Sequence, residues 1–136
     1  MNYDEISKDT ILNLYKTYES LNKSPLNQQL RVMIELHVSQ LNRCSDCCQL
    51  HTEEAQKLGV DPLKIEQLPQ WKHSALFSDA EKEVLAWSES LTTLSDNPTV
   101  KKTNLSNYFS EREIVDITAC IAIMNAFNRI AVSLKD

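Results

Sequence analysis

Residues 44–51 read Cys44-Ser45-Asp46-Cys47-Cys48-Gln49-Leu50-His51, and this stretch says most about the chain. On a helix, Cys44 and Cys47 lie on neighbouring turns of one face, and His51 lies one turn further along. A helix that begins near Cys44 also offers unpaired N–H groups and the positive end of its dipole to a thiolate, which lowers the pKa of a cysteine. The pattern therefore predicts redox chemistry.

The composition around this motif favours an all-α chain. The 136 residues include one glycine and four prolines, which leaves too few residues of positive φ for many tight hairpins. A chain of this length fits a single domain, residues 1–136, and can bury a core without disulfide staples. The formal net charge of −5 gives no basic surface, so we expect no nucleic-acid binding.

The N-terminal sequence Met1-Asn2-Tyr3-Asp4-Glu5 is acidic and polar, unlike a secretory signal. No apolar run approaches membrane-spanning length, so no membrane association is expected. These features predict a cytoplasmic protein. Thiols stay reduced in that compartment, where a Cys-x-x-Cys pair is more often catalytic or metal-binding than structural.

Apolar residues recur at helical spacing and predict a compact domain of about six to seven helices. The long helices are expected over residues 8–22, 26–41, 44–58, 79–94 and 110–134, with shorter ones opening at Asp61-Pro62 and Asn97-Pro98. Gly59 is expected to cap the third long helix. Ser78 and Ser110 each precede a glutamate by three residues and match capping boxes. The segment from Pro69 to Phe77 is expected to be a loop.

The last predicted helix is apolar around most of its circumference. Its apolar residues are Ile114, Val115, Ile117, Cys120, Ile121, Ile123, Met124, Phe127 and Ile130. In so small a domain, a helix of this kind is expected to bury part of its surface against another subunit. The sequence therefore predicts a homo-oligomer.

The stretch Val38–Cys47 with His51, followed by Glu53-Glu54-Ala55, resembles the alkylhydroperoxidase D-like, carboxymuconolactone decarboxylase family. Later blocks are similar as well, namely residues 71–78, 109–116 and 125–129. The resemblance runs from about residue 26 to the end of the chain, and the cysteine block is its specific part. It implies an all-helical subunit in trimers or hexamers, with a cysteine pair that reduces peroxides and cycles through a disulfide.

Carried over residue by residue, the resemblance implies that Cys47 attacks the peroxide, Cys44 resolves the product and His51 relays a proton. Two positions depart from the alkylhydroperoxidase pattern. Val32 stands where that branch has a glutamate, and Asp46 replaces a second histidine between the two cysteines. A carboxylate beside the thiols disfavours a thiolate, so Asp46 is expected to oppose the reaction.

Glu35 could replace the missing glutamate, because it lies less than one helical turn from Val32. If the chain reverses near Asn42-Arg43, Glu35 and His51 lie eight residues on either side of Arg43 and could meet across two antiparallel helices. Glu35 could then hold the ring of His51 in the tautomer that accepts a proton from the thiol.

The remaining cysteines and histidines have simpler interpretations. Cys48 points about 100° away from Cys47 on a helix and is expected to be a core thiol. Cys120, in the apolar last helix, is expected to pack in the core. The residue pattern leaves the roles of His37 and His73 open.

Three other functions remain as alternatives. Cys44, Cys47 and His51 could bind zinc with Glu35 or His37 as a fourth ligand, although a second Cys-x-x-Cys or His pair is missing. Lactone decarboxylation belongs to the family name, but that branch works without the cysteine pair. A non-catalytic oligomeric scaffold is the third possibility. Haem attachment is excluded because Cys48, not histidine, follows Cys47.

The working hypothesis is a cytoplasmic thiol-dependent peroxidase or disulfide reductase that acts in antioxidant defence. Its site residues are Cys47, Cys44, His51 and Glu35. The expected partners are a hydroperoxide substrate and a thiol or disulfide reductant protein, and the chemistry calls for no cofactor and no metal.

Overall fold

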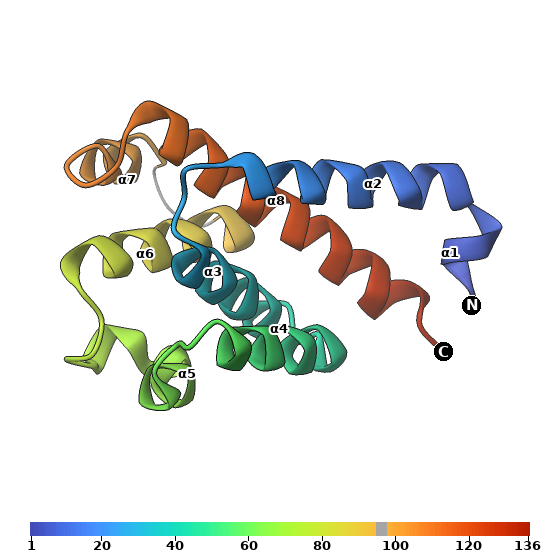
Figure 1. The fold of residues 1–136 in the computed structure, drawn as a ribbon, viewed down its shortest axis with the longest axis horizontal. Coiled ribbons are helices and arrows are strands. Elements are labelled where there is room, and N and C mark those ends of the chain that lie inside the picture. Colours follow the sequence, from blue (N-terminus) through green and yellow to red (C-terminus); the bar gives the residue numbers. More distant parts are fainter. Residues whose placement is uncertain (95–97) are drawn as a thin grey trace.

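The computed structural model describes residues 1–94 and 98–136, and within them it contains helices and no strand (Figure 1). The α-helices are α1 (Tyr3–Ile6), α2 (Lys8–Ser20), α3 (Gln28–Leu41), α4 (Ser45–Lys57), α5 (Pro62–Gln67), α6 (Asp79–Thr93), α7 (Pro98–Leu105) and α8 (Glu111–Leu134). Two 3₁₀ helices, η1 (Leu21–Lys23) and η2 (Leu68–His73), join them. The prediction of an all-α fold is confirmed, and the short helix α1 is an element that the apolar pattern did not predict.

Local sequence signals fix where the long helices begin and end. Ser78 and Ser110 both form capping boxes, with each serine accepting from the backbone N–H of the third helical residue and that glutamate accepting from the serine N–H. Gly59 follows α4 with φ of +76°, as expected for a left-handed cap. Helix α7 begins at Pro98, whereas Asn97 lies outside the described residues.

Helix α3 is the centre of the fold because it is buried on nearly every side. Its residues from Val32 to Ser39 are all buried, and it packs against α4, α6 and α8. One core cluster joins α3 to α6 and α8 around Ile34, Val84 and Ile121. A second cluster joins the other side of α3 to α4 and η2 around Leu36, Ala55 and Leu68. The site residues on α3 and α4 are therefore held by packing on both sides.

The loop predicted between α5 and α6 is only partly correct. Residues Leu68–His73 form η2, with Pro69 near its start, whereas residues 74–77 are a loop as predicted. Trp71 is buried there and donates from Nε1 to Glu89 on α6 over 2.9 Å. This long-range anchor stabilises a short helix that local propensity alone would not favour.

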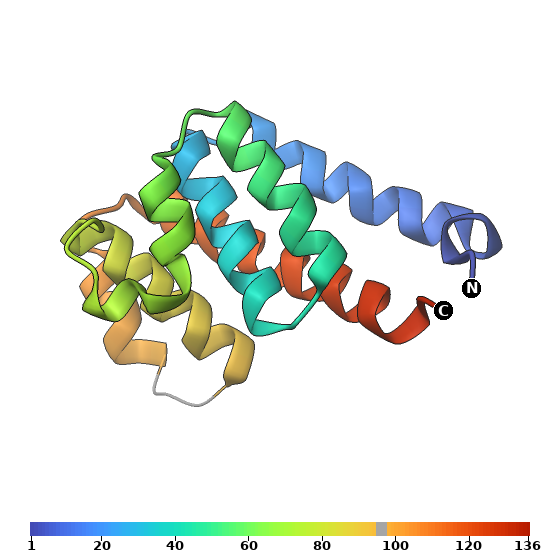
Figure 2. The same cartoon turned by 90° about the horizontal axis from the view of Figure 1, so that it is seen from below.

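Helix α8 is long and apolar enough to cross a membrane, by length and composition only. The expectation that no apolar run approaches membrane-spanning length is therefore wrong for α8. Core helices pass the same test, and α8 buries Ile117, Ile121 and Met124 against α3 and α6. The apolar character of α8 is thus partly explained by core packing. In Figures 1 and 2, α8 ends beside α1, so the two chain termini lie at the same end of the molecule.

Candidate active site

The two cysteines of the motif lie at the start of α4 and form a disulfide. Cys44 is the N-cap of α4 and Cys47 is its third residue, with 5.2 Å between their Cα atoms. Cys44 is buried and Cys47 is half-buried. The first N–H groups of a helix have no partner within it, so both sulfur atoms lie at the positive end of the α4 dipole.

The turn that precedes Cys44 is fixed by a polar network from α8. Arg43 adopts the left-handed region with φ of 56°. Beside it, Asn42 donates from Nδ2 to Asn125 over 2.9 Å and to Asn128 over 3.0 Å. Asn128 is fully buried and donates in turn to Ser39 on α3. Because buried amides are costly to leave unpaired, this network determines where α4 begins.

His51 lies one turn beyond Cys47 and meets two carboxylates. Its Nδ1 is 3.3 Å from Oε2 of Glu35 and 2.9 Å from Oε2 of Glu54. The structure therefore brings Glu35 and His51 together across α3 and α4. Since carboxylates accept hydrogen bonds, a neutral His51 carries its proton on Nδ1 and keeps Nε2 free to accept one.

Glu35 is a buried carboxylate with several donors around it. It is 2% exposed, receives a hydrogen bond from Tyr18 Oη at 2.7 Å and pairs with Arg31 Nε at 2.8 Å. Burial and the Glu35 carboxylate raise the pKa of Tyr18 above its usual range, so Tyr18 remains a proton donor. Arg31 and Tyr18 thus hold the carboxyl group of Glu35 in place beside His51.

Val32, which occupies the glutamate position of the resembled family, packs in the second core cluster. It takes no part in the Glu35–His51 contact. Glu35, one turn later on α3, is the carboxylate that faces His51.

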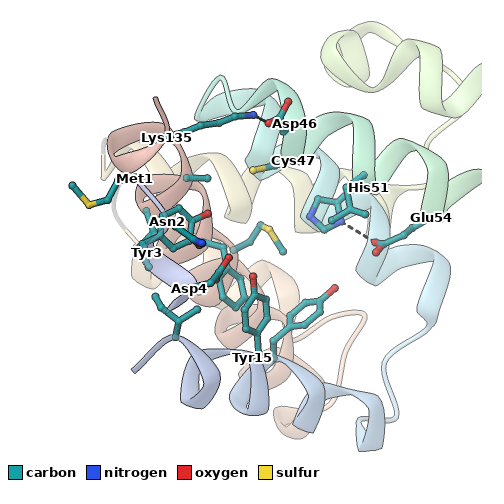
Figure 3. A pocket seen from close by; sticks show the side chains of 17 residues that line it. Met1, Asn2, Tyr3, Asp4, Tyr15, Asp46, Cys47, His51, Glu54 and Lys135 are labelled. Carbon is teal, nitrogen blue, oxygen red and sulfur yellow. Dashed lines mark hydrogen bonds and ion pairs between the residues drawn. The ribbon is translucent and has the colours of Figure 1, made fainter. Parts of the chain in front are cut away.

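An apolar cavity of about 400 Å³ opens beside Cys47 and His51 (Figure 3). Its residues come from both chain ends and from α2, α4 and α8, and they are Met1, Asn2, Tyr3, Asp4, Ile11, Tyr15, Tyr18, Asp46, Cys47, Leu50, His51, Glu54, Met124, Phe127, Ile130, Ala131 and Lys135. Tyr15 stacks on Phe127, with 5.1 Å between ring centroids, and Tyr18 meets the same ring edge-on. Such a wall suits an organic molecule better than a small polar one.

Asp46 has a partner that the sequence analysis did not foresee. Its carboxylate pairs with the ammonium group of Lys135, near the C-terminus (Figure 3). This pairing offsets the charge that was expected to oppose a thiolate at Cys47.

The other two cysteines differ in surroundings. Cys48 is half-buried against the second core cluster, and burial raises the pKa of its thiol. Cys120 is in the core as predicted, but its Sγ also lies 3.9 Å from Oε1 of Glu35. Burial and the Glu35 carboxylate raise the pKa of the Cys120 thiol, so it stays protonated. Neither environment favours a reactive thiolate.

The structure separates His37 and His73 from this site. His37 is buried, its Nε2 lies 3.1 Å from Glu89, and its Nδ1 lies 3.5 Å from Gln40. His73 is exposed on η2. The zinc site considered in the sequence analysis is therefore not formed in this structure. Cys44 and Cys47 are bonded to each other, and His37 contacts Glu89 instead. Within the described residues, Glu35, His51 and Glu54 do place ligand atoms within 4.8 Å of one another.

His37 gives a testable dependence of stability on pH. Burial lowers the pKa of His37 below its usual value of 6.5, so the folded protein binds this proton less readily than the unfolded chain. The stability that comes from keeping His37 neutral is complete above about pH 7 and is lost as the pH falls below about 6.5, because the unfolded chain takes up the proton first. We expect His37→Gln to flatten the fall in unfolding free energy between pH 7 and pH 5.5, measured by urea denaturation. His73→Gln, the exposed control, should leave the slope unchanged; an equal change in both variants would contradict this role.

Comparison with known proteins agrees with the fold. The chain is 27% identical over 136 residues to the uncharacterized protein YdfG of Bacillus subtilis, covering 98% of this chain and 92% of the relative. A crystal structure of an Agrobacterium tumefaciens protein of unknown function, named as a candidate AhpD antioxidant defence protein, superposes with a TM-score of 0.94 at 27% identity and covers 100% and 94% of the two chains. The debrominase Bmp8 shares the fold alone, with a TM-score of 0.86 at 19% identity over 97% of this chain and 72% of that one. The family pattern itself matches residues 11–90, and the chain belongs to the carboxymuconolactone decarboxylase family.

Proposed function

We propose that this protein is a thiol-dependent peroxidase or disulfide reductase in which Cys47 attacks a hydroperoxide. The observation that carries the proposal is the Cys44–Cys47 disulfide at the wall of an apolar cavity that His51 also lines. The similarity to a candidate AhpD antioxidant defence protein supports the same role.

In the oxidative half of the cycle, His51 accepts the proton of the Cys47 thiol at Nε2. The thiolate attacks the terminal peroxide oxygen, the O–O bond breaks, and the leaving alkoxide takes the proton from His51 to become an alcohol. Cys47 is then a sulfenic acid. Cys44 then loses its thiol proton, and its thiolate attacks the sulfur of Cys47, so that the disulfide forms. The displaced hydroxide takes up the proton from Cys44 and leaves as water.

Glu35 is proposed to orient His51 rather than to exchange protons itself. It is buried, and Arg31 and Tyr18 occupy its oxygens. A fixed anion at Nδ1 holds the imidazole in the tautomer with Nε2 free and stabilises the imidazolium that forms during the reaction.

The second half of the cycle needs two electrons from a thiol donor, which we propose to be a reductant protein. We further propose a cytoplasmic role in antioxidant defence and assembly into a homo-oligomer. Exposed apolar side chains support assembly, among them Ile6 at 71%, Val115 at 63% and Leu63 at 53% exposure.

The direct test is mass spectrometry of the reduced protein before and after one equivalent of cumene hydroperoxide, with free thiols alkylated. We expect the Cys44–Cys47 disulfide to form faster than in unfolded protein, and faster than with hydrogen peroxide, because the cavity is apolar. Four free thiols after treatment would refute the redox function.

The same sample separates the alternatives. Stoichiometric zinc in the purified protein would favour the metal site, and turnover of a carboxylated lactone without thiol oxidation would favour decarboxylation. With neither activity nor metal, the chain would be a family scaffold.

A further inference from the structure

The two cysteines of the disulfide line different cavities. Cys47 lines the apolar cavity beside His51, and Cys44 is absent from that lining. Cys44 lines a second cavity of about 250 Å³, and Cys47 is absent from the second lining. Asp46, Ala131 and Lys135 line both, so the Asp46–Lys135 ion pair stands between the two spaces.

The second cavity differs in chemistry from the first. Its residues are Arg43, Cys44, Ser45, Asp46, Ala131, Val132, Lys135 and Asp136, most of them charged or polar. Cys44 is only 4% exposed, and it lines this cavity and not the one beside His51. The two cations of the cavity, Arg43 and Lys135, are balanced by the carboxylates of Asp46 and Asp136, so the space is polar without a net charge. A small polar thiol donor suits such a space better than it suits the aromatic wall beside Cys47.

The stability of the leaving thiolate also distinguishes the two sulfur atoms. Attack on Cys44 expels Cys47, which is half-buried at the N-terminus of α4. Attack on Cys47 instead expels a thiolate at the buried Cys44, where loss of solvation disfavours charge. Thiol–disulfide exchange is faster when the leaving thiolate is the more stable one.

We infer that the cavity lined by Cys44 is the docking site for the thiol reductant, whose thiolate attacks Cys44 from this side while hydroperoxide uses the side of Cys47. This inference rests on the proposed function for its biological role. The two half-reactions then occur on opposite sides of the Asp46–Lys135 pair, and an alcohol product still in the apolar cavity does not block reduction.

Reduction of the protein takes two thiol–disulfide exchanges. The donor thiolate forms a bond to Cys44 Sγ, the Cys44–Cys47 bond breaks, and its electron pair leaves with Cys47 as a thiolate. A second donor thiol then attacks the mixed disulfide, which releases Cys44 as a thiolate and the donor as a disulfide. Two electrons pass to the protein, and the donor protons end on the two released thiolates.

Trapping of the mixed disulfide tests which sulfur is attacked. The oxidised protein is mixed with 2-mercaptoethanol, quenched at short times with iodoacetamide, and sequenced by tandem mass spectrometry. We expect mercaptoethanol on Cys44 and the alkyl group on Cys47. Mercaptoethanol on Cys47 in half or more of the trapped molecules would overturn the inference. The assay uses the disulfide as it stands, so it does not depend on peroxide activity.

Two exposed apolar residues offer a matched pair of cavity-filling variants. Val132 lines the Cys44 side alone and Leu50 lines the Cys47 side alone, at 55% and 53% exposure. We expect Val132→Trp to slow reduction by dithiothreitol about tenfold and to leave oxidation by cumene hydroperoxide within about twofold. Leu50→Trp should do the reverse.

The outcomes separate the two proposals. If Val132→Trp reduces as fast as the wild type while Leu50→Trp reduces slowly, the donor uses the Cys47 side and the inference fails. If cumene hydroperoxide oxidises no variant, the proposed function fails, whereas the trapping result still decides which sulfur a thiol attacks.

Discussion

Cys47→Ser is expected to lower the rate of hydroperoxide consumption by about 1,000-fold or more. A serine hydroxyl remains protonated at neutral pH and is a poor nucleophile toward a peroxide oxygen. Cys47 is half-buried at the start of α4, so the substitution should leave the unfolding free energy of the reduced protein nearly unchanged. The measurement is peroxide consumption coupled to dithiothreitol, with a urea denaturation curve for each variant.

Cys48→Ser is the matched control, since it alters the adjacent residue of the same helix and leaves the Cys44–Cys47 pair intact. It should keep most of the activity, because burial raises the pKa of the Cys48 thiol and disfavours its thiolate. Full peroxide turnover by Cys47→Ser, or loss of activity in Cys48→Ser instead, would show that the wrong cysteine has been assigned.

The local part of the fold could be predicted from short sequence signals. Ser78 and Ser110 begin helices because a side chain three residues later completes each capping box. Gly59 ends α4 because it takes a positive φ at low cost. Signals of this kind act within one turn of chain and do not depend on the rest of the molecule.

Two elements of the fold, η2 and α1, were not predicted from the sequence, for different reasons. Helix η2 was expected to be a loop, and it is anchored by Trp71 to Glu89, 18 residues away. Helix α1 has four residues, none of them buried, so it carries no apolar period to detect. Helix η2 thus follows from tertiary packing rather than local propensity, whereas α1 is too short and too exposed to show a pattern.

In the candidate site, too, some residues are placed by local helical spacing and others by the packing of helices. Cys44, Cys47 and His51 are close because helical spacing puts them there, and Glu35 meets His51 because α3 and α4 pack side by side. The sequence analysis missed Tyr18, which reaches Glu35 from α2. It also missed the role of Glu54, although this residue lies one helical turn after His51, where spacing could have suggested it.

Lys135 and Arg31 illustrate two kinds of missed signal. Arg31 precedes Glu35 by four residues on α3, a spacing typical of helical ion pairs, so it could have been found. Lys135 pairs with Asp46 across 89 positions of sequence, and only the way α8 ends beside α4 brings the two together.

Glu35→Leu is expected to lower the unfolding free energy by about 3 kcal/mol. The substitution leaves Arg31, whose side chain is 11% exposed, as a nearly buried cation without its carboxylate. It also removes the acceptor for Tyr18. Urea denaturation at pH 7 measures the loss.

Arg31→Met combined with Glu35→Leu should recover much of the lost unfolding free energy, because replacing both members of a buried pair removes the uncompensated charge. Failure of the double variant to recover would mean that packing, not charge, sets the cost.

Glu35→Gln separates the role of Glu35 in the reaction from its role in stability. Glutamine keeps the volume and can still accept from Tyr18, but it lacks the negative charge that faces Nδ1 of His51. We expect cumene hydroperoxide to oxidise Glu35→Gln about 10- to 100-fold more slowly, the typical cost of losing a group that orients a histidine. Reduction of its disulfide by dithiothreitol should change much less, since the donor approaches Cys44.

Glu53→Gln, an exposed change two residues after His51, is the control. Equal slowing of oxidation and reduction would make Glu35 a structural residue alone, because a proton held at His51 matters to the attack on peroxide and not to the attack on Cys44.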